Sequence, residues 1–184
     1  MIINFLQNLD CTRPDLEDYL STALSKYNYK IGTSKIVVDN GNFMIKKVFG
    51  KPTISEVEIS LAANSENLND FFALAMLPSG DGTIYIQEKI DITLPDYIRS
   101  IEKILYGSFR EIYREMGLQE LLYRSDCVVL YYLFRRHNLE EILKFQEFVV
   151  KHNLTDLMFY NAGFDSEGNL KFFDYSGIDR ELME

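Results

Sequence analysis

The chain has 184 residues, of which 47% are hydrophobic and 26% charged, and this balance favours a folded core over a disordered chain. Its formal net charge of −9 argues against a protein whose main partner is nucleic acid, because binding to phosphate backbones depends largely on Lys and Arg. The longest apolar stretch, residues 127–134, is far shorter than the roughly 20 residues of a membrane-spanning helix. We therefore expect neither nucleic-acid binding nor a membrane span.

The two cysteines, Cys11 and Cys127, are isolated from each other in the sequence. Zinc sites use closely spaced cysteine pairs, and secreted disulfide scaffolds use many cysteines. The segment before Asp10 has neither the basic leader nor the long apolar core of a signal peptide. These features predict a cytoplasmic protein, with the host cytosol as the setting if the chain is an injected effector.

The first half of the chain is predicted to be mainly antiparallel sheet. Strand-like runs at residues 35–39 and 43–49 flank Asn40-Gly41-Asn42, and Asn-Gly is the strongest short hairpin signal. Two further strands, joined by a turn, are expected over residues 71–76 and 83–87.

Apolar residues at helical spacing predict helices throughout the chain. In the first half they lie at residues 15–27 and 55–63. In the second half a long helix over residues 95–116 is expected to end at Gly117, because glycine is a natural helix stop. Two more helices are expected over residues 118–136 and 139–151, followed by a loop at 153–161, a turn at 163–168 and a strand at 170–173.

These elements predict an α+β fold in two parts. Residues 1–88 would form a helix and a β-rich part, and residues 89–184 a mainly helical part. The boundary is expected within residues 88–94.

Polar residues near the end of the chain have a distinctive spacing. Asp156 and Asn161 are five positions apart in an Asp-Leu-three-residue-Asn pattern, and Asp174 follows thirteen positions later after two phenylalanines. Here the sequence resembles the protein kinase-like superfamily, whose catalytic loop and Asp-aromatic-Gly element have this arrangement. The resemblance extends from about residue 31 to residue 177.

The resemblance implies a bilobed fold, with a small antiparallel sheet in the N-lobe and a reduced, mainly helical C-lobe. It also implies ATP and Mg²⁺ as cofactors, and the hydroxyl of a protein or small molecule as phosphoryl acceptor. Asp156 would be the catalytic base, and Asn161 and Asp174 would hold the metal, because magnesium prefers hard oxygen ligands.

A lysine near the end of a predicted strand adds to the resemblance. Phe43-Met-Ile-Lys46 is similar to the strand whose lysine reaches the nucleotide phosphates in kinases. The family pairs this lysine with a glutamate on the next helix, for which Glu58 is the first choice and Glu56 the second. Either glutamate would otherwise be an ordinary solvated helix residue.

The nucleotide would lie between the two lobes. Residues 83–90 resemble the strand and hinge that face adenine, with Gln87 at the gate and Glu88 and Ile90 in the hinge. The glycine-rich loop is reduced to one glycine, so the phosphates would contact Gly32 and the hydroxyls of Thr33 and Ser34.

Several features depart from the kinase pattern. Leu154 and Thr155 stand where the family has His-Arg, and Met158 stands where it commonly has a lysine. Only seven residues follow Gly177, so a truncated, minimal kinase is expected, like those of bacteria, phages or injected effectors.

Two other functions fit the same sequence. One is a catalytically inactive kinase-like binding module, a pseudokinase that docks a protein partner, which the thin glycine loop and Met158 favour. The other is an α+β interaction protein unrelated to kinases. Its partner would meet the aromatic residues Tyr123, Tyr131, Tyr132 and Phe134, although aromatics at helical spacing are more often core.

Overall fold

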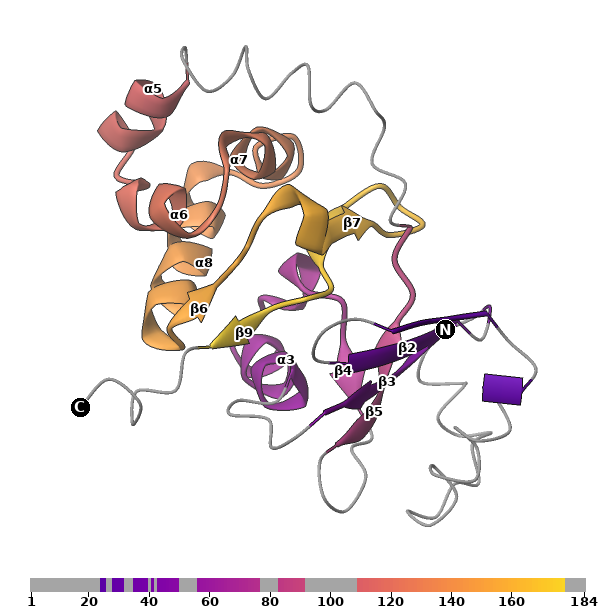
Figure 1. Ribbon diagram of the computed structural model, residues 1–184. Coiled ribbons are helices and arrows are strands. Elements are labelled where there is room, and N and C mark those ends of the chain that lie inside the picture. The colour runs from indigo at the N-terminus through magenta and orange to yellow at the C-terminus, as the bar shows by residue number, and fades with distance from the viewer. Residues whose placement is uncertain are drawn as a thin grey trace.

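The computed structural model describes residues 24–25, 28–31, 35–39, 41, 43–49, 56–76, 83–91 and 109–177 (Figure 1). Most of the predicted helix at residues 15–27, the turn at 78–82 and the first part of the helix at 95–116 lie outside these residues. So do Gly32, Thr33 and Ser34.

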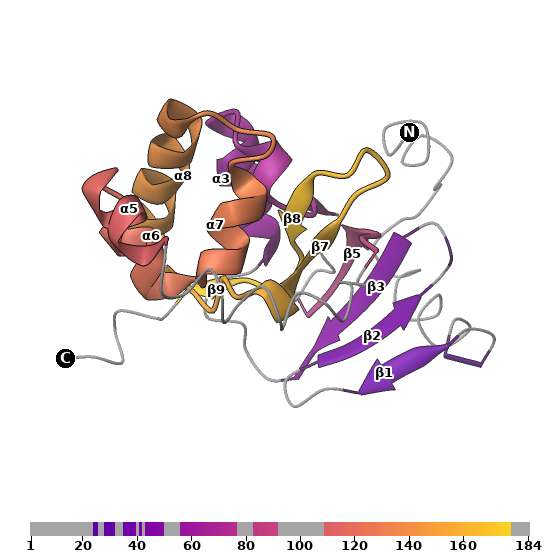
Figure 2. The same cartoon turned by 90° about the horizontal axis from the view of Figure 1, so that it is seen from above.

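A five-stranded antiparallel sheet forms one side of the molecule, and the helices lie mainly on the other side (Figure 2). The strand order is β1-β2-β3-β5-β4, and every described pairing in this sheet is antiparallel. This confirms the α+β class. The strands are β1 (Tyr29–Ile31), β2 (Lys35–Asp39), β3 (Phe43–Val48), β4 (Ala75–Met76) and β5 (Ile84–Glu88).

The predicted hairpin is confirmed as β2 and β3. Gly41 has φ +92°, a conformation that glycine adopts without steric cost, and its amide donates to Asp39 Oδ1 at 2.8 Å. The register pairs Val37 with Lys46, so alternate residues of both strands face opposite sides of the sheet. One face buries an apolar cluster composed of Val38, Phe43, Ile45, Ile84 and Ile86.

Helix α3 (Glu56–Ser65) joins the sheet to the helical side. Val57 packs in a small cluster with Ala75 and Tyr85 of the sheet, whereas Ile59 and Ala63 belong to the large core of the helical side. The helix predicted at residues 55–63 is therefore confirmed, and it contributes to both cores.

The helical side surrounds a core rich in aromatic side chains. Phe72, Phe145, Phe148 and Phe172 are each at most 1% exposed, and Phe72 contacts the other three rings. The helices are η1 (Asn69–Phe71), α5 (Arg110–Glu115), α6 (Gln119–Arg124), α7 (Cys127–Leu133) and α8 (Leu139–Lys151).

Helix α8 has the predicted bounds, but the helix predicted over residues 118–136 is wrong because it is two helices, α6 and α7. Ser125 is extended between them, with φ −138° and ψ −176°. Asp126 then caps α7 by accepting the amide of Val129 at 2.9 Å, which satisfies a donor that the broken helix would leave unpaired.

The strand predicted over residues 71–76 is also shorter than expected. Phe71 ends a 3₁₀ helix, and Ala73 donates its amide to the carbonyl of Phe172 at 2.8 Å instead of continuing the strand. Only Ala75–Met76 pairs with β5.

The last described segment forms two small two-stranded sheets. Strands β7 (Ala162–Phe164) and β8 (Leu170–Phe172) make a hairpin, and β6 (Leu154–Thr155) pairs with β9 (Ser176–Gly177). The short 3₁₀ helix η2 (Phe159–Asn161) lies between β6 and β7.

The β7–β8 hairpin is attached to the segment that leaves the sheet after β5. Asp91 and Phe164 exchange backbone hydrogen bonds of 2.9 and 3.1 Å. Gly163 permits this approach, since a Cβ atom there would lie 2.5 Å from the carbonyl oxygen of Asp91. In the described part of the chain, no helix combines the length and apolarity that crossing a bilayer requires.

Candidate functional site

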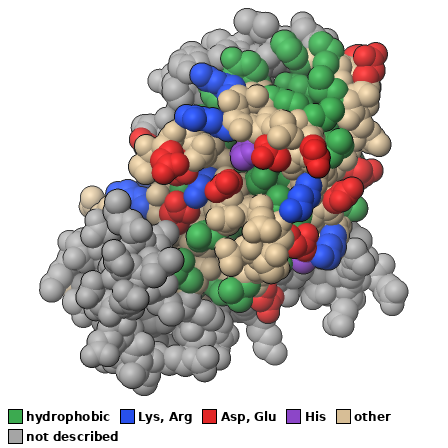
Figure 3. Space-filling view, turned by 180° about the vertical axis from the view of Figure 1, so that it is seen from behind, with side chains coloured by type: hydrophobic (Ala, Val, Ile, Leu, Met, Phe, Trp, Pro, Cys, Tyr) green, Lys and Arg blue, Asp and Glu red, His purple; other side chains and the backbone are tan. Residues whose placement is uncertain are grey.

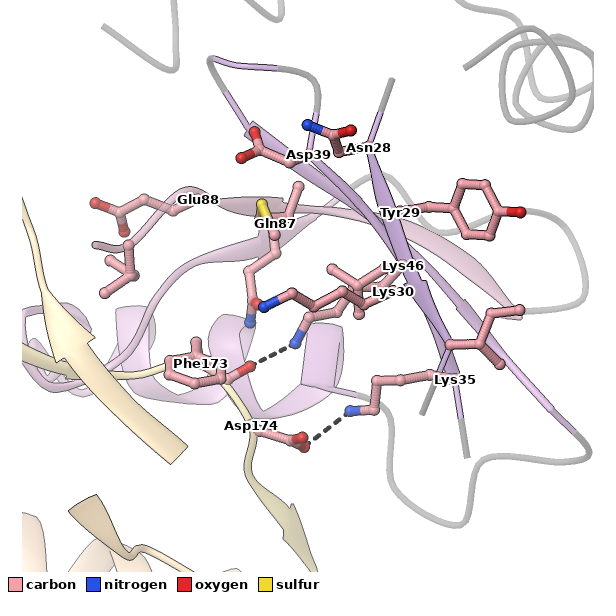
Figure 4. Close-up of a pocket in the computed structure, with 14 residues that line it drawn as sticks. Asn28, Tyr29, Lys30, Lys35, Asp39, Lys46, Gln87, Glu88, Phe173 and Asp174 are labelled. Atoms are coloured by element: carbon pink, nitrogen blue, oxygen red, sulfur yellow. Dashed lines mark hydrogen bonds and ion pairs between the residues drawn. The ribbon is translucent and has the colours of Figure 1, made fainter. Parts of the chain in front are cut away.

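A cavity of about 750 Å³ opens between the sheet and the segment that follows β8 (Figure 4). Its wall is formed by the second face of the sheet, opposite the apolar cluster, together with Phe173 and Asp174. The hairpin register explains this wall, because side chains on neighbouring strands share a face when their positions pair. The residues of β2 and β3 that line the cavity are Lys35, Val37, Asp39, Met44 and Lys46.

Lys46 forms a buried ion pair at this wall. It is 3% exposed, and its Nζ lies 3.0 Å from Glu56 Oε2, which also accepts from Gln87 Nε2 at 3.1 Å. Burial lowers the pKa of Lys46, and the neighbouring Glu56 carboxylate opposes this change. A lysine on the sheet is thus held by the first residue of α3.

Glu56, and not Glu58, is the partner of Lys46, so the first choice for this pair was wrong. Successive helix residues are rotated by about 100°, so two residues that are two positions apart point in nearly opposite directions. Glu56 is 6% exposed and faces the sheet, whereas Glu58 is exposed.

Lys35 is a second cation at the same carboxylate. Its Nζ lies 2.6 Å from Glu56 Oε1 and 2.8 Å from Asp174 Oδ1. Burial opposes its charge, but the two carboxylates outweigh burial and hold the pKa of Lys35 above its ordinary value. We call Lys35, Lys46, Glu56 and Asp174 the pocket cluster; its formal charges cancel.

The segment after β8 connects this cluster to Asn161. Lys46 Nζ also donates to the carbonyl of Phe173 (Figure 4). The carbonyl of Asn161 accepts the amide of Phe173 at 3.0 Å and that of Asp174 at 3.4 Å. Asp174 keeps a 42% exposed side chain on the cavity wall.

Asn161 in turn holds Asp156. Its Nδ2 donates to Asp156 Oδ2 at 2.8 Å and to the Asp156 carbonyl at 2.9 Å. Asp156 is exposed and has φ +60°, a left-handed conformation that is uncommon outside glycine and concentrates at functional sites. Tyr160 donates its hydroxyl to Asp156 Oδ1 at 2.7 Å, and this bond raises the pKa of Tyr160.

The junction between α6 and α7 fixes the loop that carries Asp156. Arg124 donates to the carbonyl of Leu154 at 2.9 Å, and its own carbonyl accepts the amide of Leu157 at 3.0 Å. Asp126, the cap of α7, accepts the amide of Phe159 with its second oxygen at 2.9 Å. The helix break that the sequence prediction missed therefore positions both ends of this loop.

The structure thus brings together Lys46, Asp156, Asn161 and Asp174 in one hydrogen-bonded network, with Glu56 in place of Glu58. Among the described residues, Lys46 and Asp174 line the cavity itself, and Asp156 and Asn161 are connected to it through Asp174. Gln87, Glu88 and Ile90 also line the cavity.

Asn161 and Asp174 are the residues that would hold a magnesium ion here. Asn161 uses its amide nitrogen to hold Asp156, which leaves its amide oxygen for a ligand, and its backbone carbonyl accepts the amide of Asp174. Magnesium keeps several waters and needs only one or two protein ligands. No cluster of three or more His, Cys, Asp or Glu suited to a metal occurs in the described ranges.

A second group of charges lies where the sheet meets the β7–β8 hairpin. Lys171 Nζ lies 3.1 Å from both oxygens of Glu88 and 3.6 Å from Asp165 Oδ2. We call these three residues the Lys171 cluster. Burial alone would raise the pKa of Asp165, but hydrogen bonds from Asn169 and Glu167 and the charge of Lys171 hold it below its ordinary value.

Sequence reasoning missed the roles of Lys35 and Tyr160. The predicted hairpin contained the signal for Lys35, because a residue two positions from the cross-strand partner of Lys46 lies on the same face. Tyr160 had no such signal, since its contact with Asp156 depends on the turn made by η2.

The aromatic residues proposed as a partner surface mostly belong to the core. Tyr132 is buried, and Tyr131 and Phe134 pack against the aromatic core, while Tyr123 is 85% exposed. Seen from behind, the face in view carries both acidic and basic side chains (Figure 3).

No model of a known protein family matches this chain, and a search among curated proteins also found no match.

Proposed function

We propose that this chain is an ATP- and Mg²⁺-dependent phosphotransferase of minimal kinase-like form. Residues 1–88 would make a small N-lobe and residues 89–184 a reduced helical C-lobe. The acceptor would be the hydroxyl of a protein or small molecule, and the setting the cytosol, of the host if the chain is injected, where ATP and magnesium are available.

One observation carries this proposal. A continuous set of hydrogen bonds runs from Glu56 through Lys46, the Phe173 carbonyl and Asn161 to Asp156. It joins the early sheet to two late loops beside a cavity of about 750 Å³, which is within the usual size range of ligand pockets.

Lys35 and Lys46 would give the cavity an affinity for the phosphates of a nucleotide. Lys46 is held against the wall by Glu56 and would contact the phosphates as a positioned cation. Lys35 lines the same cavity. Its positive charge would bind the phosphates in place of the backbone amides that a loop with three glycines provides in kinases. A bound triphosphate would draw Lys35 away from Asp174.

Asp174 and the amide oxygen of Asn161 would hold the magnesium ion. When bound, that ion neutralises the phosphate oxygens and orients the transferred group. The release of Asp174 from Lys35 would give its carboxylate to the metal, so nucleotide and metal binding would support each other.

Asp156 would act as the base. Asn161 fixes one oxygen of Asp156, and the other oxygen accepts from the hydroxyl of Tyr160. A base that deprotonates an acceptor hydroxyl needs a hydrogen bond of this kind. With Met158 in place of a lysine, one source of electrostatic stabilisation is missing, so we expect slow turnover.

Thermal denaturation with ATP and magnesium tests the proposal. Both together should raise the melting temperature of the wild-type chain, and Asp174→Ala should abolish the shift because it removes a metal ligand and a partner of Lys35. Asp70→Ala, at an exposed position on η1, is the control and should keep the full shift. Absence of any shift in the wild type at saturating nucleotide would refute the proposal.

A pseudokinase that docks a protein partner is the second candidate. It is favoured by the occupation of both key carboxylates by the chain itself, Asp174 by Lys35 and Asp156 by Tyr160. Phosphate release by the wild type and by Asp156→Ala distinguishes the two. Equal background rates would favour the binding module, and a loss of about a hundredfold would favour the enzyme.

A further inference from the structure

A tyrosine of the chain itself fills the acceptor position beside the proposed base. The hydroxyl of Tyr160 donates to Asp156 Oδ1 at 2.7 Å, and the other oxygen of Asp156 accepts from Asn161. A general base must lie about 2.6–3.2 Å from the group that it deprotonates. Tyr160 meets this requirement before any substrate is bound.

The surroundings of Tyr160 allow a reaction at its hydroxyl. The side chain is 55% exposed, and its ring lies edge-on to Phe159 at a centroid distance of 5.7 Å. A phosphate ester formed there would stay in contact with water, which a doubly charged group needs. The hydroxyl reaches Asn161 through Asp156, since the second oxygen of that carboxylate accepts from Asn161 Nδ2 at 2.8 Å.

We propose that Tyr160 is an intramolecular phosphorylation site, modified by the active site of its own chain. This inference rests on the proposed phosphotransferase activity, and its co-reactant is a nucleoside triphosphate. The phenolic oxygen attacks the γ-phosphorus, and the bond from that phosphorus to the oxygen bridging the β-phosphate breaks. The electron pair leaves with the nucleoside diphosphate, and the phenolic proton passes to Asp156 Oδ1.

Contact with Asp156, and not exposure alone, selects Tyr160. Tyr123 on α6 is more exposed, at 85%, and is the matched control, because both tyrosines are accessible on the surface. Tyr85 and Tyr175 are each 1% exposed and lie inside the fold.

The test incubates the whole chain with magnesium and ATP labelled at its γ-phosphate. Mass spectrometry of the digested protein should place the phosphoryl group on Tyr160. Total incorporation should fall to background in Tyr160→Phe and stay at the wild-type level in Tyr123→Phe. The first-order rate constant should not change when the protein is diluted, because donor site and acceptor belong to one molecule.

Nucleotide-induced melting shifts separate this inference from the function on which it rests. Tyr160→Phe should keep the wild-type shift, which shows that its loss of labelling is not a loss of folding. If the wild type shows a shift that depends on Asp174 but Tyr160 stays unlabelled, the phosphorylation site is wrong and the phosphotransferase proposal stands. If no shift occurs, both fail. A rate constant that rises with protein concentration would overturn the intramolecular route.

Discussion

Two groups of partly buried charges connect the sheet to the C-terminal part of the chain, and they are built differently. In the Lys171 cluster the carboxylates also accept backbone amides: Glu88 accepts that of Leu74, and Asp165 accepts those of Glu167 and Asn169. In the pocket cluster, the Glu56 carboxylate accepts from the side chains of Lys35, Lys46 and Gln87.

The difference indicates which group is structural and which is open to a ligand. Backbone donors cannot leave without disturbing the fold, so the Lys171 cluster fixes the hairpin to the end of β5. Lysine side chains can change partners by rotation, and Asp174 is 42% exposed on a cavity. We therefore expect mutations in the Lys171 cluster to affect mainly stability, and mutations in the pocket cluster to affect mainly binding.

Lys171→Met should give the largest loss of stability. It leaves Glu88 and Asp165, with side chains 18% and 10% exposed, without their shared cation, which costs about 3 kcal/mol in buried pairs. Urea denaturation measures the loss, and the remaining folded protein should still show a melting shift with ATP and magnesium. Exposed Lys144→Met is the control and should change the free energy of unfolding by less than about 1 kcal/mol. If Lys171→Met kept the stability of the wild type but lost nucleotide binding, the Lys171 cluster would be the binding group and not the structural one.

Asp165→Asn should have a smaller effect that depends on pH. The pKa of Asp165 is lowered in the folded state, so its contribution is present above the ordinary pKa of the carboxyl group and is lost as the pH falls through the lowered value. The wild type should therefore lose more stability than Asp165→Asn as the pH falls from neutral into the acid range.

Urea denaturation at a series of pH values measures this difference. Glu120→Gln, at an exposed position on α6, is the control and should follow the wild-type curve. Parallel curves for the wild type and Asp165→Asn would show that the hydrogen bonds of Asp165 contribute no acid-sensitive stability.

The fold was predictable where short-range rules decide it. The Asn-Gly turn predicted the hairpin and thereby the face that carries Lys46, and the capping box formed by Asn138 and Glu141 accompanies the correctly predicted helix α8. The break at Ser125 was not predictable from periodicity, because it depends on a bridge to Leu157 that is distant in sequence.

The candidate site was predictable as a set of spacings but not as a set of contacts. The intervals between Asp156, Asn161 and Asp174 predicted residues that the fold does connect. The choice between Glu56 and Glu58 depended on the rotation of α3 about its axis, which the packing of Val57 and Ile59 determines. Sequence periodicity does not give the rotation of α3, because its faces differ little in hydrophobicity.

We expect Lys46 to bind the phosphates of a nucleotide, and calorimetric titration of Lys46→Met and Lys47→Met with ATP and magnesium tests this most directly. Lys47 is the neighbouring residue of β3 and points to the opposite face of the sheet. Glu56 keeps Lys35 and Gln87 in the Lys46→Met variant, so that variant should fold. We expect Lys46→Met to weaken binding by about a hundredfold and Lys47→Met to leave it unchanged. Equal affinities for the two variants and the wild type would show that Lys46 does not bind the nucleotide phosphates.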